Sequence, residues 1–144
     1  MNKEQIKTIL PHREPMLLVE ESNIVVSEGG EKKAVGSYTV QGDEWFLQGH
    51  FPGNPVVPGV ILCEMMAQNC CVLLAEQQPE GAPMTPMFTG LNNVKFRNPV
   101  VPGDKIVIES EITRANGMFF FAKGEVRVND KRCASADFSF AMVK

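Results

Sequence analysis

The fold of this chain depends most on one stretch, which reads Gly49-His50-Phe51-Pro52-Gly53-Asn54-Pro55-Val56-Val57-Pro58-Gly59-Val60-Ile61-Leu62-Cys63-Glu64-Met65-Met66-Ala67-Gln68. Three prolines and three glycines fall in its first eleven residues, a composition typical of a loop. An apolar run then continues to about Gln77, with apolar residues on nearly every face, as in a helix buried on all sides. Pro58 suits the first turn of that helix, where N–H groups have no partner within the helix.

The predicted helix carries a carboxyl group in its middle. Glu64 lies there, and Gln68 follows one turn later on the same face. An unpaired ionised carboxylate is too costly to bury, so Glu64 must be paired, protonated or lining a cavity. A buried polar group with no role in catalysis is the alternative interpretation.

His50 lies on the loop that leads into the helix, fourteen residues before Glu64. A histidine near a carboxyl group and a helix N-terminus suggests proton transfer, because a free imidazole is largely neutral at pH 7. A structural histidine beside a Pro-Gly loop is the alternative. The other histidine, His12, is expected to be a hydrogen-bonded structural residue.

Three stretches, in register over most of the chain, together resemble the 3-hydroxyacyl-[acyl-carrier-protein] dehydratases of the FabZ type. The resemblance implies a hotdog fold, in which an antiparallel sheet wraps around one long central helix. Glu64, rather than the Asp of the related bifunctional dehydratase/isomerase, favours the FabZ type. The stretch quoted above is joined by Leu10-Pro11-His12-Arg13-Glu14-Pro15-Met16-Leu17-Leu18-Val19 and Val94-Lys95-Phe96-Arg97-Asn98-Pro99-Val100-Val101-Pro102-Gly103-Asp104.

The length of 144 residues fits one domain, residues 1–144, with a full hydrophobic core. An all-apolar helix needs a sheet around it, so we expect an α+β fold. Asp43-Glu44 are expected to cap a short turn over residues 45–47. The other expected elements are a short helix at 2–9, strands at 16–26, 32–40, 87–97, 105–114, 118–128 and 132–143, and a loop at 79–86.

The resemblance also implies a reaction and the residues that carry it out. A (3R)-hydroxyacyl thioester of fatty acid biosynthesis loses water to give a trans-2-enoyl product, with His50 as base and Glu64 as acid. Burial among apolar residues favours the protonated carboxyl group that this role requires. The backbone N–H groups of Gly59 and Val60 can face the thioester oxygen, and Gly59 lets the substrate approach the backbone closely. Gln68 is expected to hydrogen-bond Glu64.

The net charge of −3 argues against nucleic acid as a partner. Residues 1–94 hold five basic and eleven acidic side chains, whereas residues 95–144 hold nine and six. The basic C-terminal half could meet the acidic acyl carrier protein, or its charges could lie on solvated strand faces. The resemblance further implies a homodimer, pairing the histidine of one chain with the carboxylate of the other, and a trimer of such dimers. Phe88 and Phe96 could line an apolar tunnel for the acyl chain, with Met87 where relatives often have an aromatic gate.

The four cysteines fit no metal or redox spacing, and we expect inert core thiols. No metal-ligand cluster or nucleotide-binding loop is present, so no cofactor and no metal are expected. The N-terminal residues lack the apolar core of a signal peptide, and polar residues interrupt the longest apolar run. We therefore expect a cytoplasmic protein with no membrane-spanning segment. The cysteines are Cys63, Cys70, Cys71 and Cys133.

Two other functions remain open from the residues alone. An acyl thioesterase on the same fold would use a carboxylate to activate water, and it would not need a base histidine before the helix. A non-catalytic acyl-binding module would keep the fold without activity. Reaction with a 3-hydroxyacyl thioester separates the three by its outcome, which is an enoyl product, a free thiol or neither.

Overall fold

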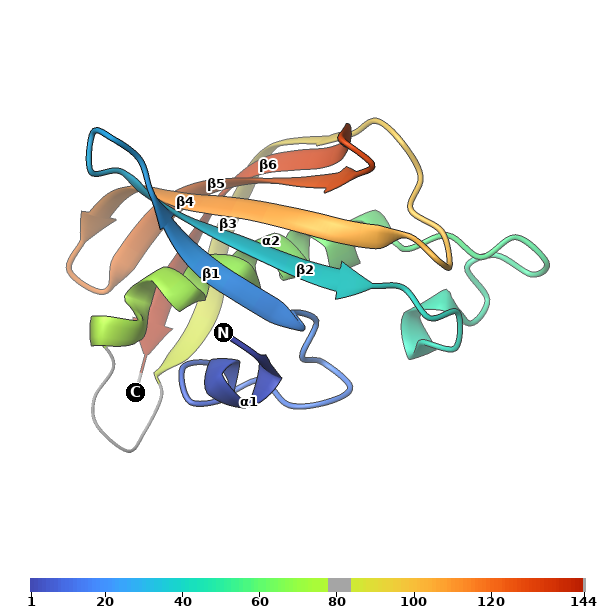
Figure 1. Ribbon diagram of the computed structural model, residues 1–144, viewed down its shortest axis with the longest axis horizontal. Helices are drawn as coiled ribbons and strands as arrows, with labels where there is room; N and C mark the ends of the chain where they lie inside the picture. Colours follow the sequence, from blue (N-terminus) through green and yellow to red (C-terminus); the bar gives the residue numbers. More distant parts are fainter. Residues whose placement is uncertain (78–83, 144) are drawn as a thin grey trace.

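A long helix, α2, runs through the middle of the molecule, and a six-stranded sheet wraps around it (Figure 1). The computed structural model describes residues 1–77 and 84–143. The α-helical part spans Gly59–Cys71 and continues as a 3-10 helix, η2, over Val72–Gln77. Pro58 stands directly before the first helical residue as its cap, in extended geometry. The predicted architecture is confirmed, and helical residues continue to Gln77, where the apolar run of the sequence ends.

All neighbouring strands pair antiparallel, in the order β1-β2-β4-β5-β6-β3. β1 and β3 are therefore the edge strands, and β3 ends the sheet beside β6. Buried and more exposed residues alternate along much of β4 and β5, as expected of a sheet with one face on the core. The strands are β1 (Glu21–Val26), β2 (Lys32–Thr39), β3 (Thr85–Phe96), β4 (Lys105–Asn116), β5 (Phe119–Val128) and β6 (Lys131–Val143).

The first strand is shorter than predicted. A strand over 16–26 is expected from the sequence, but β1 begins only at Glu21. Residues 17–19 are buried in the core, and the N–H of Leu18 donates to Oε1 of Gln68 at 2.9 Å. A side chain of α2 thus takes a hydrogen bond that a neighbouring strand would otherwise supply, so strand pairing starts after this contact.

The N-terminal helix is also shorter than predicted. α1 spans Lys3–Ile6, where a helix over 2–9 is expected, and Asn2 caps its start through its side chain. Beyond Ile6 the chain tightens, because backbone N–H groups bond to carbonyls three residues back. Ile6 and Ile9 are buried and form the inner face, as predicted.

The turn before the His50 loop forms where predicted, as a 3-10 helix, η1, over Trp45–Leu47. The predicted side-chain cap is wrong, because the Glu44 side chain makes no hydrogen bond to this turn and only its backbone carbonyl accepts from the N–H of Leu47. Burial acts to raise the pKa of Glu44, but the hydrogen bonds that its carboxylate accepts outweigh burial and hold the pKa below its ordinary value. Glu44 therefore ties the segment before η1 to the end of β2. The donors, all at 2.8 Å, are the Tyr38 hydroxyl and the N–H groups of Gln41 and Gly42.

A buried polar network holds α2 against the sheet. Oδ1 of Asn69 accepts from the Ser22 hydroxyl at 2.7 Å, and Nδ2 donates to the carbonyls of Ala34 at 2.9 Å and Ile108 at 3.2 Å. These bonds join the helix to β1, β2 and β4. Gly36 on β2 faces the same amide, and a Cβ there would overlap Oδ1 of Asn69. The network sets the rotation of α2 about its axis and so the directions of its other polar side chains.

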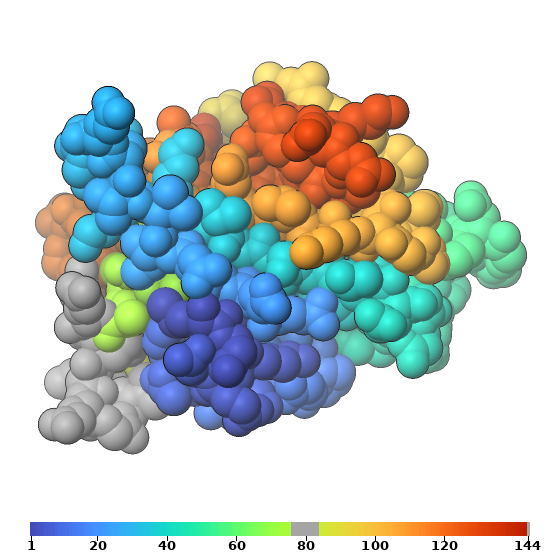
Figure 2. All heavy atoms as spheres, viewed as in Figure 1, coloured from blue at the N-terminus to red at the C-terminus, as the bar shows by residue number. Residues whose placement is uncertain are grey.

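One face of the molecule is formed by the N-terminal segment and the sheet, with α2 hidden behind them (Figure 2). The loop over residues 51–55 is exposed and projects beyond the rest of the molecule at one end (Figure 1). This loop joins His50 to the start of α2, so both lie at that end of the fold.

Candidate active site

His50 is held by the loop that carries it. Its backbone N–H donates to the carbonyl of Leu47 at 3.0 Å, and its carbonyl accepts from the N–H of Val56 at 2.8 Å. Between these points Phe51 and Asn54 exchange backbone hydrogen bonds of 2.9 and 2.8 Å. The loop predicted from the prolines and glycines is confirmed, and its backbone determines where the imidazole lies.

The imidazole of His50 makes one hydrogen bond that selects its tautomer. Nδ1 lies 2.9 Å from the carbonyl oxygen of Val56. A carbonyl oxygen only accepts, so in the neutral ring Nδ1 carries the proton and Nε2 keeps a lone pair. The ring also stacks on Phe51, with 4.1 Å between the ring centroids. A lone pair on a held imidazole nitrogen is what a general base needs.

The carboxyl group of Glu64 is partly enclosed on α2. Its side chain is 23% exposed, and Gln68 donates from Nε2 to its Oε2 at 2.9 Å, the contact expected from the sequence. Glu64 is therefore hydrogen-bonded and also lines a cavity, as its place in an apolar helix requires. The cavity has a volume of about 20 Å³ and is also lined by His12, Ala67, Gln68, Cys71, Pro86, Phe88 and Phe140.

His50 and Glu64 do not meet within one chain. Among the described residues His50 bonds to Val56 and Glu64 bonds to Gln68, and no hydrogen bond or ion pair joins the two candidate residues. A base and an acid that act on adjacent carbons of one substrate must lie close together. Within one chain the two side chains are thus held by separate partners, Val56 for His50 and Gln68 for Glu64.

The first turn of α2 offers unpaired N–H groups. Within the described part of the chain, neither Gly59 nor Val60 donates its N–H to an acceptor, and the first helical bonds come from Ile61 and Leu62 to the carbonyl of Pro58. Val60 is 71% exposed, so this turn lies at the surface. Two unpaired donors at the positive end of a helix suit an oxygen on which negative charge develops.

Phe96 lies over this same turn. A Cβ on Gly59 would lie 2.6 Å from Cζ of Phe96, so the missing side chain makes room for the aromatic ring. Room for Phe96 is thus a second reason for glycine here, beside the close approach of a substrate that is expected from the sequence. Phe96 is 56% exposed, which leaves its ring space to move.

His12 contacts the candidate acid, which the sequence does not indicate. It is expected to be a hydrogen-bonded structural residue, but its Nε2 lies 3.4 Å from Oε2 of Glu64. Its Nδ1 is buried without a hydrogen-bond partner among the described residues. No periodicity or spacing links His12 to Glu64, because the contact joins segments far apart in the chain. The one available signal is that both residues lie in stretches that resemble the dehydratases.

The cysteines are core residues, as predicted. All four are free and buried, and burial raises the pKa of the Cys70 thiol to about 12. Protonated thiols are poor nucleophiles and poor metal ligands. Over residues 1–77 and 84–143, no group of three or more His, Cys, Asp or Glu side chains could hold a metal ion. No helix in that part of the chain has the length and apolar character needed to cross a membrane.

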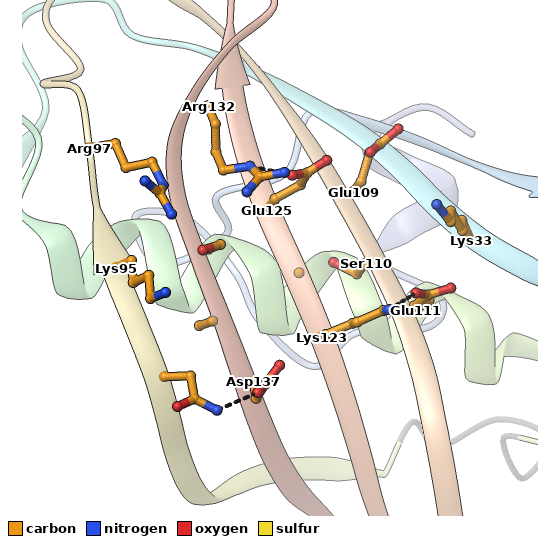
Figure 3. Close-up of a pocket in the computed structure, with 14 residues that line it drawn as sticks. Lys33, Lys95, Arg97, Glu109, Ser110, Glu111, Lys123, Glu125, Arg132 and Asp137 are labelled. Carbon is orange, nitrogen blue, oxygen red and sulfur yellow. Dashed lines mark hydrogen bonds and ion pairs between the residues drawn. The ribbon is translucent and has the colours of Figure 1, made fainter.

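A cavity of about 390 Å³ lies on the face of the sheet turned away from α2, where the labelled charged side chains stand in front of the strands (Figure 3). None of the candidate catalytic residues lines this cavity. Ion pairs of 2.9 Å join Lys123 to Glu111 and Arg132 to Glu125 across neighbouring strands. These pairs favour the interpretation that the charges of residues 95–144 lie on solvated strand faces. The candidate site remains at α2.

Comparison with known proteins gives the family. Residues 10–137 match the family model described as FabA-like domain. A 3-hydroxyacyl-[acyl-carrier-protein] dehydratase FabZ from Pelotomaculum thermopropionicum is 43% identical over 138 residues, covering 96% of each chain. The chain belongs to the FabZ family. The FabZ protein of Caulobacter vibrioides is 41% identical over 143 residues, which cover 97% of this chain and 87% of that protein.

Solved structures share the fold of this FabZ-family chain. The dehydratase heterocomplex ApeI:P from Xenorhabdus doucetiae has a TM-score of 0.78 at 22% identity, covering 96% of this chain and 91% of that chain. The E. coli PaaI protein from the phenylacetic acid degradation operon has a TM-score of 0.59 at 16% identity, covering 83% and 82%. At such identities the likeness concerns the fold alone, and the predicted hotdog fold is confirmed.

Proposed function

We propose that this FabZ-family chain is a (3R)-hydroxyacyl-[acyl-carrier-protein] dehydratase in which His50 is the base and Glu64 the acid. The contact between Nδ1 of His50 and the carbonyl of Val56 carries the proposal, because it leaves a lone pair on Nε2. General acid–base action by such groups contributes about 10²–10⁴-fold to a rate. The acyl carrier protein delivers the substrate thioester, in keeping with the names of the FabZ relatives.

The elimination moves two protons. Nε2 of His50 removes a proton from C2, and the electron pair of that C–H bond forms the C2–C3 double bond as the C3–O bond breaks. The departing hydroxide takes the proton of Glu64 and leaves as water. Because Gln68 donates to Oε2, the acidic proton sits on Oε1. A proton returns from the His50 imidazolium to Glu64 through solvent, which resets the site.

The thioester oxygen is stabilised at the start of α2. As the C2 proton is removed, negative charge builds up on this oxygen, and the N–H groups of Gly59 and Val60 can donate to it. One such donor is worth about 3 kcal/mol where it has been tested by mutation. No step in this scheme needs a metal or an organic cofactor.

Two copies of the chain complete the site. His50 and Glu64 do not meet within one chain, and β3 is an edge strand of 12 residues. Long apolar edge strands pair with other strands, and identical copies pair through a two-fold axis. We place a homodimer interface along β3, with His50 of one copy facing Glu64 of the other, and three such dimers form a trimer of dimers. The exposed apolar side chains of this strand are Met87, Phe88, Leu91 and Phe96.

The binding site for the acyl chain lies along β3. Phe88 and Phe96 belong to the exposed apolar set of β3 and line the tunnel that holds the acyl chain.

The reaction takes place in the cytoplasm, which the four free cysteines support, because thiols remain reduced in that compartment.

Product analysis tests the proposal. The purified protein is incubated with a (3R)-hydroxyacyl thioester of acyl carrier protein, and the products are resolved by mass spectrometry. A trans-2-enoyl thioester, lighter by one water, is expected. Release of free carrier thiol would instead indicate a thioesterase, and an unchanged substrate would indicate an acyl-binding module.

A further inference from the structure

Two side chains converge on one oxygen of Glu64. Nε2 of Gln68 lies 2.9 Å from Oε2, and Nε2 of His12 lies 3.4 Å from the same atom. The side chains of His12 and Glu64 are only 18% and 23% exposed, and all three residues line one small cavity. Of the other described residues of that lining only Cys71 is titratable, and burial raises the pKa of its thiol well above the ordinary value, so the thiol stays neutral and His12 is the basic neighbour of the carboxyl group.

Backbone contacts determine which atom of Gln68 faces Glu64. The N–H of Leu18 can only donate, and it bonds to Oε1 of Gln68 at 2.9 Å. The amide nitrogen Nε2 therefore donates both to the carbonyl of Met16 at 2.7 Å and to Oε2 of Glu64. Oε2 is thus an acceptor in this network, and the same two backbone bonds anchor the segment that carries His12 to α2.

The backbone around His12 is also anchored from the other side. The guanidinium of Arg13 donates to the carbonyls of Leu10 at 2.9 Å and of His12 itself at 2.7 Å. The position of the His12 ring beside Glu64 is therefore set by its backbone. Because Nδ1 is buried without a partner among the described residues, and a buried lone pair is easier to leave unpaired than a buried N–H, the ring proton belongs on Nε2.

We propose that His12 is a positioning residue for the dehydration, and the inference rests on the proposed function. With its proton on Nε2, His12 donates toward Oε2 of Glu64, and Gln68 donates to the same oxygen. The two donors hold one oxygen of the carboxyl group and keep the acidic proton on Oε1, where it meets the substrate hydroxyl. The 3.4 Å separation shortens when substrate is bound, as catalytic hydrogen bonds commonly do.

Three substitutions separate this role from simple packing. His12→Gln places an amide N–H close to the position of Nε2, whereas His12→Asn places one close to that of Nδ1, and His12→Leu removes both donors. We expect His12→Leu and His12→Asn to lower kcat about tenfold with KM changed less than twofold, since a donor to a reacting group is lost. His12→Gln should recover kcat to within about threefold of the wild type. Wild-type kcat in folded His12→Leu, or a loss in His12→Gln equal to that in His12→Leu, would overturn the proposal.

Nitrogen NMR gives a readout that does not depend on turnover. The chain has 2 histidines, so the ring signals of protein labelled with ¹⁵N-histidine fall into two sets. We expect His12 as the Nε2–H tautomer and His50 as the Nδ1–H tautomer, and we expect Glu64→Gln to shift the ring signals of His12. An Nδ1–H tautomer at His12, or ring signals unmoved by Glu64→Gln, contradicts the proposal. If the wild type forms no enoyl product, the proposed function fails, while these signals still decide whether His12 donates to Glu64.

Discussion

The Nδ1 atom of His50 lies 2.9 Å from the carbonyl oxygen of Val56 on the same loop. That contact selects the tautomer that leaves Nε2 with a lone pair, because a carbonyl accepts only from an N–H. The carboxyl group of Glu64 is oriented in the same manner, since Gln68 donates to its Oε2. His50 is thus oriented by a direct bond to the backbone, and Glu64 is oriented by Gln68, which is itself bonded to the backbone. These bonds leave Nε2 of His50 and Oε1 of Glu64 for proton transfer.

Removing the base should abolish dehydration without disturbing the fold. We expect His50→Ala to lower kcat by about 10² or more. His50→Asn is the sharper variant, because its amide nitrogen can keep the bond to the Val56 carbonyl while no basic nitrogen remains. Circular dichroism and the melting temperature serve as controls for folding. At least half of wild-type turnover in either folded variant would remove His50 from the mechanism.

The acid should be equally sensitive to substitution. Glu64→Gln keeps the shape and can still accept from Gln68, but it cannot give up a proton, so we expect kcat to fall by about 10² or more with little change in stability. Glu64→Asp should be impaired less, because the shorter side chain misplaces a carboxyl group that can still donate. Single-turnover kinetics with enzyme in excess over substrate measure the step directly. Near-normal kcat in Glu64→Gln would mean that Glu64 is only a buried polar group.

Gly59 offers a test of what the first turn of α2 is for. We expect Gly59→Ala to lower kcat about tenfold or more, because a methyl group would displace the thioester from the N–H groups. The exposed ring of Phe96 can swing away from the methyl group, so the free energy of unfolding should change by less than about 1 kcal/mol. Adding Gly59→Ala to the Phe96→Ala variant should lower kcat by the same factor as Gly59→Ala lowers the kcat of the wild type. Recovery of kcat in the double variant would show that Gly59 serves only to accommodate Phe96.

The contact between β2 and α2 predicts a stability effect far from the chemistry. Gly36→Ala would push a Cβ into Oδ1 of Asn69, whose hydrogen bonds hold the helix in place. We expect the free energy of unfolding in urea to fall by about 1–3 kcal/mol, as for other overpacked cores. Gly29→Ala is a matched control, because a Cβ there meets nothing closer than 4.0 Å. Equal effects of the two substitutions would argue against a tight fit at Asn69.

Much of the fold can be predicted from the sequence because its signals are local. The all-apolar run after Pro58 predicts the helix, and the Asn-Gly and Asn-Asp pairs predict the last hairpins. Residues 16–20 are mispredicted as a strand because their structure depends on a contact between Leu18 and Gln68, which are 50 residues apart. No local pattern carries information about such a contact.

The roles of His50 and Glu64 stay predictions. Glu64 is a candidate because a carboxyl group is unusual in an apolar helix, and His50 is a candidate because the stretch that holds both residues resembles the dehydratases. The place of His12 beside Glu64 is not predictable, because two tertiary contacts, of Arg13 and of Gln68, bring the segment there. Oε2 of Glu64 accepts in this network because of the same tertiary contact of Gln68.

The central claim is that His50 of one copy works with Glu64 of another, and mixed oligomers test it most directly. His50→Asn and Glu64→Gln chains with different tags are co-expressed, and oligomers that carry both tags are isolated. A mixed dimer holds two sites, one of which has both wild-type residues, so isolated mixed dimers should recover about half of wild-type activity and hexamers of randomly paired dimers about a quarter, although each variant alone is inactive. Confirmed mixed oligomers with no more activity than the separate variants would contradict a shared site.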